Sequence, residues 1–176
     1  MIFLKKIILT ILIIGIFLFN NKTEAVVIPN DAIRLRVIPN SNSSYDQEIK
    51  MKVSKVLQQN LYNLLKDIKG ASSAREVINE NLDEIDKSIN ELLIKEKYDL
   101  GYKINYGDNY FPEKEYKGIK YEEGNYESLL VTLGSGTGDN WWCVLFPPLC
   151  LIEADESEAE EVEYKFFIQE LIEKYL

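Results

Sequence analysis

A strand is predicted near the start of the chain, where apolar and charged residues alternate. The apolar positions are Ile33, Leu35 and Val37, and the residues between them are Arg34 and Arg36. This period of two is typical of a strand with one buried face. We interpret the two arginines as the solvated face of this strand, which ends at the turn-forming segment 39–43.

A long amphipathic helix is predicted to follow. From residue 44 to about residue 70, apolar residues recur at every third or fourth position, which is the spacing of one buried helix face. Ser43 or Ser44 is the expected N-cap, and Gln47 is placed for a capping box with Ser44. Gly70 is the expected C-terminal stop.

A second helical pattern runs from Ser73, its expected cap, to about Lys97. Glu76 is placed to bond back to the cap residue. Polar residues weaken the middle of this pattern, so we expect a break near Asn81. Two or three helices therefore follow the first strand.

Two further strands are predicted, one by the period-two pattern of residues 98–106 and one by the apolar run within residues 126–133, which suits a central strand. The segment 110–124 between them has no clear period and is interpreted as a loop. These elements predict an α+β fold, with a small, mostly antiparallel sheet of three or four strands and two or three helices packed on one face.

The stretch 134–150 has the most unusual composition of the chain, since it holds both tryptophans and both cysteines. Glycines free the backbone and Pro-Pro restricts it, so we expect a rigid loop that presents large apolar groups to a partner. Adjacent residues of an extended chain point to opposite sides, so only one of the two tryptophans can face the core. The expected partner-binding residues are Trp141, Trp142, Phe146, Pro147 and Pro148, and the loop glycines are Gly134, Gly136 and Gly138.

Cys143 and Cys150 predict a disulfide that closes this Trp/Pro loop, because an exported chain meets a non-reducing setting. Closing so short a loop stabilises the fold by about 2.5 kcal/mol in the chain-entropy description. Two buried free thiols are the alternative. A phosphate-binding loop is disfavoured, because Asp139 stands where a dinucleotide fingerprint needs a glycine and Pro147 prevents the helix that should follow.

The N-terminal residues 1–25 predict an export signal. Lys5 and Lys6 precede an apolar run, residues 7–19, that makes about 20 Å of helix and is too short to span a bilayer. Cleavage is expected before Val26. An uncleaved membrane anchor is the alternative.

The remainder divides into an expected α+β signalling domain, 26–152, and a C-terminal region, 153–176. Seven of the eleven residues from 153 to 163 are acidic. This composition predicts a solvated acidic linker, and the residues after it form an amphipathic segment.

Composition excludes several classes of function. The formal net charge is −9, which makes nucleic acid a poor partner, and there is no histidine. Nucleophile pairs that need histidine and histidine-ligated zinc sites are therefore excluded. No acidic pair stands out as catalytic, and no metal or cofactor site is indicated, so we expect a protein that is not an enzyme.

Several motifs resemble the stage II sporulation protein R family. The most specific is the run from Asn140 to Cys150 after its glycine-rich lead-in, and the resemblance extends back through 34–43 and the helix start at 46–50. It also takes in Phe111-Pro112 and 124–127. It covers most of residues 32–152.

The resemblance implies a function. Members of this family are secreted from the forespore into the intermembrane space between forespore and mother cell. There they activate a membrane-embedded sporulation aspartic protease, which cleaves the sigma factor E precursor. In this reading the protein is a signal, and the 134–150 loop is its interface with the protease.

Two readings from other classes remain open. One is a membrane-surface module with Trp141, Trp142 and Phe146 in peripheral contact with lipid, although the acidic charge opposes anionic lipid. The other is a secreted, cell-wall-associated module, such as a hydrolase that uses Asp or Glu. Neither has a protease-activating role.

Overall fold

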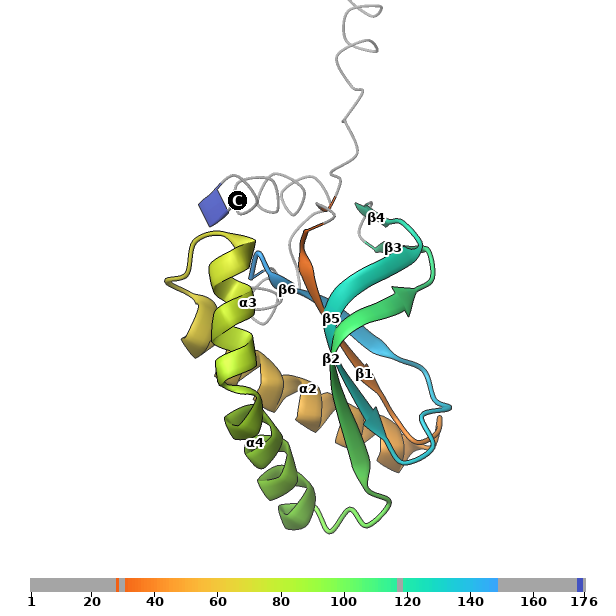
Figure 1. The fold of residues 1–176 in the computed structure, drawn as a ribbon. Helices are drawn as coiled ribbons and strands as arrows, with labels where there is room; N and C mark the ends of the chain where they lie inside the picture. The colour runs from red at the N-terminus through yellow and green to blue at the C-terminus, as the bar shows by residue number, and fades with distance from the viewer. Residues whose placement is uncertain (1–27, 29–30, 117–118, 149–173, 176) are drawn as a thin grey trace, which may run out of the picture.

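The sheet contains four strands in the order β2-β5-β1-β6 (Figure 1). The computed structural model describes residues 28, 31–116, 119–148 and 174–175. The strands of the sheet are β1 (Ile33–Ile38), β2 (Tyr102–Phe111), β5 (Gly124–Leu133) and β6 (Trp141–Phe146). The helices are α2 (Ser44–Leu65), α3 (Ala71–Glu80) and α4 (Leu82–Lys95). The predicted α+β class is thus confirmed.

The sheet is mixed. β1 is parallel to β5, whereas β6 is antiparallel to β1 and β2 is antiparallel to β5. A parallel pair needs a long crossover connection, and here the helices and β2 supply it between β1 and β5. The expected antiparallel pairing therefore holds for two of the three strand pairs.

The helices lie against one face of the sheet and enclose the core (Figure 1). Side chains alternate along a strand, so every second residue of β1 and β5 faces the helices. The fully buried residues that the two strands contribute to this core are Ile33, Leu35, Val37, Leu129, Val131 and Leu133. The apolar stripes predicted in the helical segments face them, as expected of core helices.

The ends of the helices differ in part from the sequence prediction. Ser43 is the N-cap of α2, and its hydroxyl accepts a bond from the Asp46 backbone N–H at 3.1 Å. Gln47 makes no capping box with Ser44, because its amide donates to the carbonyl of Ser41 instead. α2 ends at Leu65, and Gly70 is the N-cap of α3, so Ser73 lies inside that helix rather than at its cap. The predicted break at Asn81 is confirmed.

The segment 110–124 is not the loop that its missing period suggested. β2 continues to Phe111, and the short strands β3 (Lys114–Tyr116) and β4 (Ile119–Tyr121) pair as a hairpin that extends from the ends of β2 and β5 (Figure 1). Strands of three residues are too short for a period to show in the sequence. None of the described helices is long and apolar enough to cross a membrane.

The predicted signal peptide, 1–25, and the acidic linker, 153–163, lie outside the described residues. At the C-terminal end, Tyr175 packs edge-on against Phe146 with 6.0 Å between ring centroids. Its carbonyl accepts a bond from the Gly70 N–H at 3.0 Å. The last described residues thus contact the helical layer.

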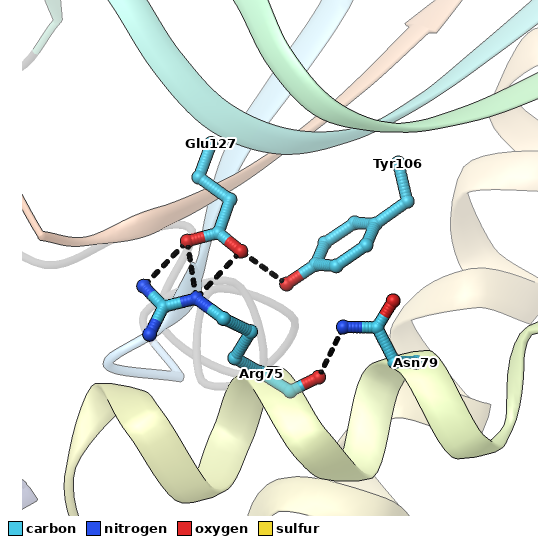
Figure 2. A network of polar contacts seen from close by, with 4 residues as sticks. All are labelled: Arg75, Asn79, Tyr106 and Glu127. Carbon is cyan, nitrogen blue, oxygen red and sulfur yellow. Dashed lines mark hydrogen bonds and ion pairs between the residues drawn. The ribbon is translucent and has the colours of Figure 1, made fainter.

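An ion pair joins α3 to β5 (Figure 2). Arg75 donates from Nε and Nη2 to both carboxylate oxygens of Glu127, at 2.6–2.9 Å, and the Tyr106 hydroxyl donates to the same carboxylate at 2.8 Å. The hydrogen bonds from Arg75 are the main cause that lowers the pKa of Glu127. This forked contact adds a directional, charge-assisted link between α3 and the sheet to the burial of Ala74 and Ile78 in the core.

We predict that Glu127→Gln lowers the free energy of unfolding by about 1–2 kcal/mol at neutral pH, a value reduced by solvent screening because Arg75 is partly exposed. The folded-state pKa of Glu127 is depressed, so its contribution is present above the unfolded pKa of about 4.3 and disappears as pH falls through the folded pKa. Denaturant melts between neutral and acidic pH should therefore show the wild-type and variant midpoints converging. Glu84→Gln, at an exposed pair with 4.0 Å between charges, is the control that should change stability by less than about 0.5 kcal/mol.

Candidate functional site

The face of the sheet that points away from the helices, here called the outer face, carries the most unusual chemistry of the described chain. The strand register places Arg34 beside Ser128 and Val144, and Arg36 beside Leu130 and Trp142. Phe111 and Tyr126 reach the same face and contact Arg34. Cations and aromatic rings are therefore concentrated on the side that α2, α3 and α4 do not cover.

The stretch from residue 134 forms a turn and then a strand, which corrects the predicted rigid loop. Residues Trp141–Phe146 are β6, an edge strand paired with β1. Bulky aromatic and aliphatic side chains suit a pleated, half-buried surface, and the pairing satisfies the backbone groups that a loop would leave to water. The proline pair follows directly after this strand.

The two tryptophans lie on opposite sides of β6, as the sequence predicted for adjacent residues. Trp141 pairs with Val37 and packs against the core cluster on the helical side. Trp142 lies on the outer face, edge-on to Phe111 with ring centroids 5.2 Å apart. Both rings are partly exposed, but only Trp142 belongs to the outer face.

The other expected partner-binding residues are covered. Phe146 is fully buried in the core, and Pro147 and Pro148 are buried behind it. Partner contact through these residues stays a prediction. Of the five side chains, Trp142 is the one that the outer face makes available.

Arg34 is buried, with 3% of its surface exposed, so the interpretation as a solvated strand residue is wrong. Its guanidinium carbon lies 3.3 Å from the ring centroid of Tyr126 and 5.2 Å from that of Phe111. Such contacts contribute about 2 kcal/mol when desolvated. Burial lowers the pKa of Arg34, and Tyr126 partly offsets that effect.

The charge of Arg34 has no carboxylate partner among the described residues, and its contacts there are with aromatic residues, Tyr126 foremost. Its Nε and Nη1 atoms are buried and make no hydrogen bond there. A buried charge without a counterion costs several kcal/mol. The cation–π contact covers only part of that cost.

Arg36 is half-buried, so its assignment as a solvated residue is also wrong. Nη1 donates to the carbonyl of Tyr110 at 3.1 Å. The amide oxygen of Asn140, in the orientation that satisfies its neighbours, accepts from Nε at 3.2 Å and from Nη2 at 2.6 Å. These acceptors are neutral, so they bond the group without compensating its charge.

A third cation completes the site. Lys114, an exposed residue of β3, places Nζ 4.9 Å from the ring centroid of Trp142, and Arg36 lies 5.8 Å from the same ring. Trp142 thus has two positive groups beside it. Because Phe111 and Tyr110 contact the arginines of β1, the far end of β2 curls over the outer face.

A second feature holds β6 in place: the turn 134–138 packs directly on segment 39–42. The carbonyl of Asn40 accepts bonds from the hydroxyls of Ser135 and Thr137 at 2.8 and 2.7 Å, and its side-chain oxygen accepts from the Ser135 N–H at 2.9 Å. The Gly138 N–H donates to the carbonyl of Pro39 at 3.1 Å. A Cβ on Gly138 would collide with the backbone of Ser41.

Asp46 connects this turn contact to α2. Its carboxylate accepts bonds from Ser41 and Asn40, and its backbone N–H is capped by Ser43. The bond from Ser41 is the main cause that lowers the pKa of Asp46. Gly138 therefore serves close backbone approach, whereas Gly134 and Gly136 adopt positive φ values of 53° and 66°, which favour glycine. The described residues show no phosphate cradle around these glycines.

Cys143 lies on β6, whereas Cys150 falls outside the described residues. The Cys143–Cys150 bridge therefore stays a prediction. Within the described ranges, no group of three His, Cys, Asp or Glu side chains is placed to hold a metal ion.

Sequence reasoning missed Arg34, Arg36, Phe111 and Lys114 as members of one site. The i, i+2 spacing of the arginines signalled that they share a face. No local pattern signalled that β2 curls over that face. In the sequence, Phe111-Pro112 indicates only the family resemblance.

Known proteins resemble the chain over nearly all of the described region. The model of a family described as Stage II sporulation protein R (spore_II_R) matches residues 29–156. Stage II sporulation protein R of Bacillus subtilis (strain 168) is 39% identical over 157 residues, which cover 89% of this chain and 70% of that protein. No solved structure matches the chain. These findings confirm the resemblance inferred from the sequence motifs.

We predict that Gly138→Ala lowers the free energy of unfolding by about 1–3 kcal/mol, because the added methyl group forces segment 39–42 away from the turn. Thermal or denaturant melts measure this loss. Asp139→Ala is the matched control, since its exposed side chain is removed while its backbone contacts remain. A wild-type midpoint for Gly138→Ala would show that the close approach adds nothing to stability.

We also predict a disulfide between Cys143 and Cys150 in the exported protein, since the pair falls within one short segment. Intact mass measured without reductant should be about two daltons below that of the reduced chain. Complete alkylation of both thiols in the native protein, before any reduction, would contradict the bridge.

Proposed function

The chain belongs to the stage II sporulation protein R family, and on this premise we propose that it is an exported signal that activates a membrane-embedded aspartic protease during sporulation. The protein acts in the space between forespore and mother cell. The activated protease of the mother cell then cleaves the sigma factor E precursor. In this proposal the protease carries the chemistry, and this chain carries the surface that it recognises.

The observation that supports a signalling surface is the position of Trp142. This ring is partly exposed on the outer face, edge-on to Phe111 and beside the cations Arg36 and Lys114. Tryptophan and arginine are the residues that contribute most to binding at protein interfaces. Their position on a rigid strand also lowers the entropy that binding would cost.

The rest of the domain has an architecture that suits presentation of this surface. On the helical side, the sheet is held by core burial and by the Arg75–Glu127 pair. At one end, it is held by the contacts of Asn40 with the turn 134–138. These contacts lie away from Trp142 and Lys114, which stay partly or fully exposed on the outer face. This arrangement favours a binding role for the outer face over a purely structural one.

Reconstitution tests the proposal. The protease and the sigma factor precursor are placed together in proteoliposomes with and without the exported chain, and precursor cleavage is measured. We expect cleavage to depend on the added chain. Equal cleavage in its absence, or none in its presence while the protease is active on a control peptide, would contradict the proposal.

The two tryptophans provide a sharper test. Trp142→Ala is expected to abolish most activation, because a hot-spot tryptophan contributes about 2 kcal/mol or more of binding, roughly a thirtyfold change in affinity. Its unfolding midpoint should stay near wild type, since the ring is not in the helical core. Trp141→Ala is the matched control, and removal of its core packing should cost about 2–4 kcal/mol of folding stability. If both variants unfold early, or both still activate cleavage, the partner surface lies elsewhere.

A further inference from the structure

Three cations on the outer face have no negative partner among the residues that the structure describes. Arg34, Arg36 and Lys114 form no ion pair with any carboxylate in the part of the chain that the structure describes. The whole chain carries a net charge of −9, so carboxylates are abundant elsewhere. The third arginine of the sequence, Arg75, is fully paired with Glu127.

The arrangement of the two unpaired arginines requires a physical explanation. They stand at positions i and i+2 of β1, about 7 Å apart on one face, and both guanidinium groups lie over the ring of Phe111, at 5.2 and 5.6 Å from its centroid. Two like charges at this distance repel each other, and burial strengthens the repulsion. An anion bound beside them would weaken the repulsion and offset part of the desolvation cost of Arg34.

We propose that the outer face binds a carboxylate from an acidic segment of a partner protein, with Arg36 and Lys114 as the contact groups and Trp142 as their apolar neighbour. Arg34 lies behind them, buried, and adds positive potential without touching the ligand. The identification of the partner as the protease rests on the proposed function. The carboxylate site itself rests only on the geometry of the described residues.

A side-chain carboxylate fits this site better than an anionic membrane surface does. Arg34, Arg36 and Lys114 lie together on one face of a protein whose overall charge is −9, so a wide anionic surface would also meet the acidic remainder of the chain and be repelled. One carboxylate reaches the cations without that repulsion. The planar fork of Arg36 matches the two oxygens of a carboxylate, and Trp142 and Phe111 provide contact for the apolar part of the incoming side chain.

The first test does not depend on the protease. The chain has only three arginines, so the Nε–H signals of Arg34, Arg36 and Arg75 are resolved by NMR while sodium acetate is titrated against sodium chloride at matched ionic strength. We expect a saturable shift of the Arg36 signal with acetate alone. The Arg75 signal is the internal control and should not shift, because the Arg75 guanidinium is already bonded to the Glu127 carboxylate.

Two results of this titration would overturn the proposal. One is an Arg36 signal that responds to acetate and chloride alike, since the site would then have no carboxylate preference. The other is a larger response to inorganic phosphate than to acetate, which would assign the face to a phosphate group, whether free or in a lipid headgroup.

The second test uses the reconstituted cleavage assay. Arg36→Gln is expected to raise the concentration of the chain that gives half-maximal cleavage by about tenfold or more, and Lys114→Gln by about threefold. Lys55→Gln, at an exposed lysine of α2, is the matched control and should behave as wild type. Because Arg36 also bonds Tyr110, its unfolding midpoint is measured in parallel, and Lys114→Gln, whose side chain is exposed, gives a reading that does not depend on folding.

The outcomes separate the two proposals. If the wild type triggers cleavage and both charge variants match it, the carboxylate site is wrong and the proposed function stands. If the wild type fails to trigger cleavage, the proposed function is wrong and the acetate titration alone decides the site. If the charge variants lose binding to phosphatidylglycerol vesicles but keep cleavage activity, the face binds lipid and the inference is overturned.

Discussion

The contact between segment 39–42 and the turn 134–138 is the constraint on which the rest of the sheet depends. Asn40 bonds the turn through its carbonyl and its side chain, and Gly138 approaches so closely that no side chain fits there. This contact joins the turn after β1 to the turn before β6, so it fixes the register of the edge strand that carries Trp142. Asp46 extends the same contact to the first turn of α2, which ties the helical layer to the edge of the sheet.

The two faces of the sheet differ in the interactions that stabilise them. On the helical side, burial of aliphatic side chains supplies the favourable free energy of folding, and the Arg75–Glu127 pair is satisfied in charge and in hydrogen bonds. On the outer face, Arg34 is buried with two nitrogen atoms unbonded among the described residues, and Arg36 is bonded only to neutral acceptors. Among the described residues, Arg75 thus has a carboxylate partner, whereas Arg34 and Arg36 have none.

The sequence was sufficient where a local pattern determines the structure. The strand at Ile33–Ile38, the Ser43 cap, the break at Asn81 and the opposite directions of the two tryptophans all follow from neighbouring residues. The sequence was insufficient where contacts between distant segments determine burial or strand pairing. Arg34 reads as a solvated strand residue until β2 and Tyr126 cover it, and β6 reads as a loop because its strand partner lies about a hundred residues earlier. The glycines of the turn 134–138 indicated an unusual backbone, but nothing in the sequence indicated that this turn packs against segment 39–42.

Arg34 and Arg36, without a carboxylate partner among the described residues, lower the stability of the free protein. Their presence is easier to understand as a property of the complex with a partner. A core designed for stability alone would replace Arg34 with an apolar residue of similar size, which often stabilises a protein. In the free chain, cation–π contact with Tyr126 and Phe111 offsets part of the desolvation cost of Arg34. A partner carboxylate beside Arg36 and Lys114 would offset more of it, so part of the electrostatic energy missing from the folded monomer would be recovered on binding. The affinity would then depend on charge geometry at the outer face, and the apolar core behind the sheet would serve to keep that geometry fixed.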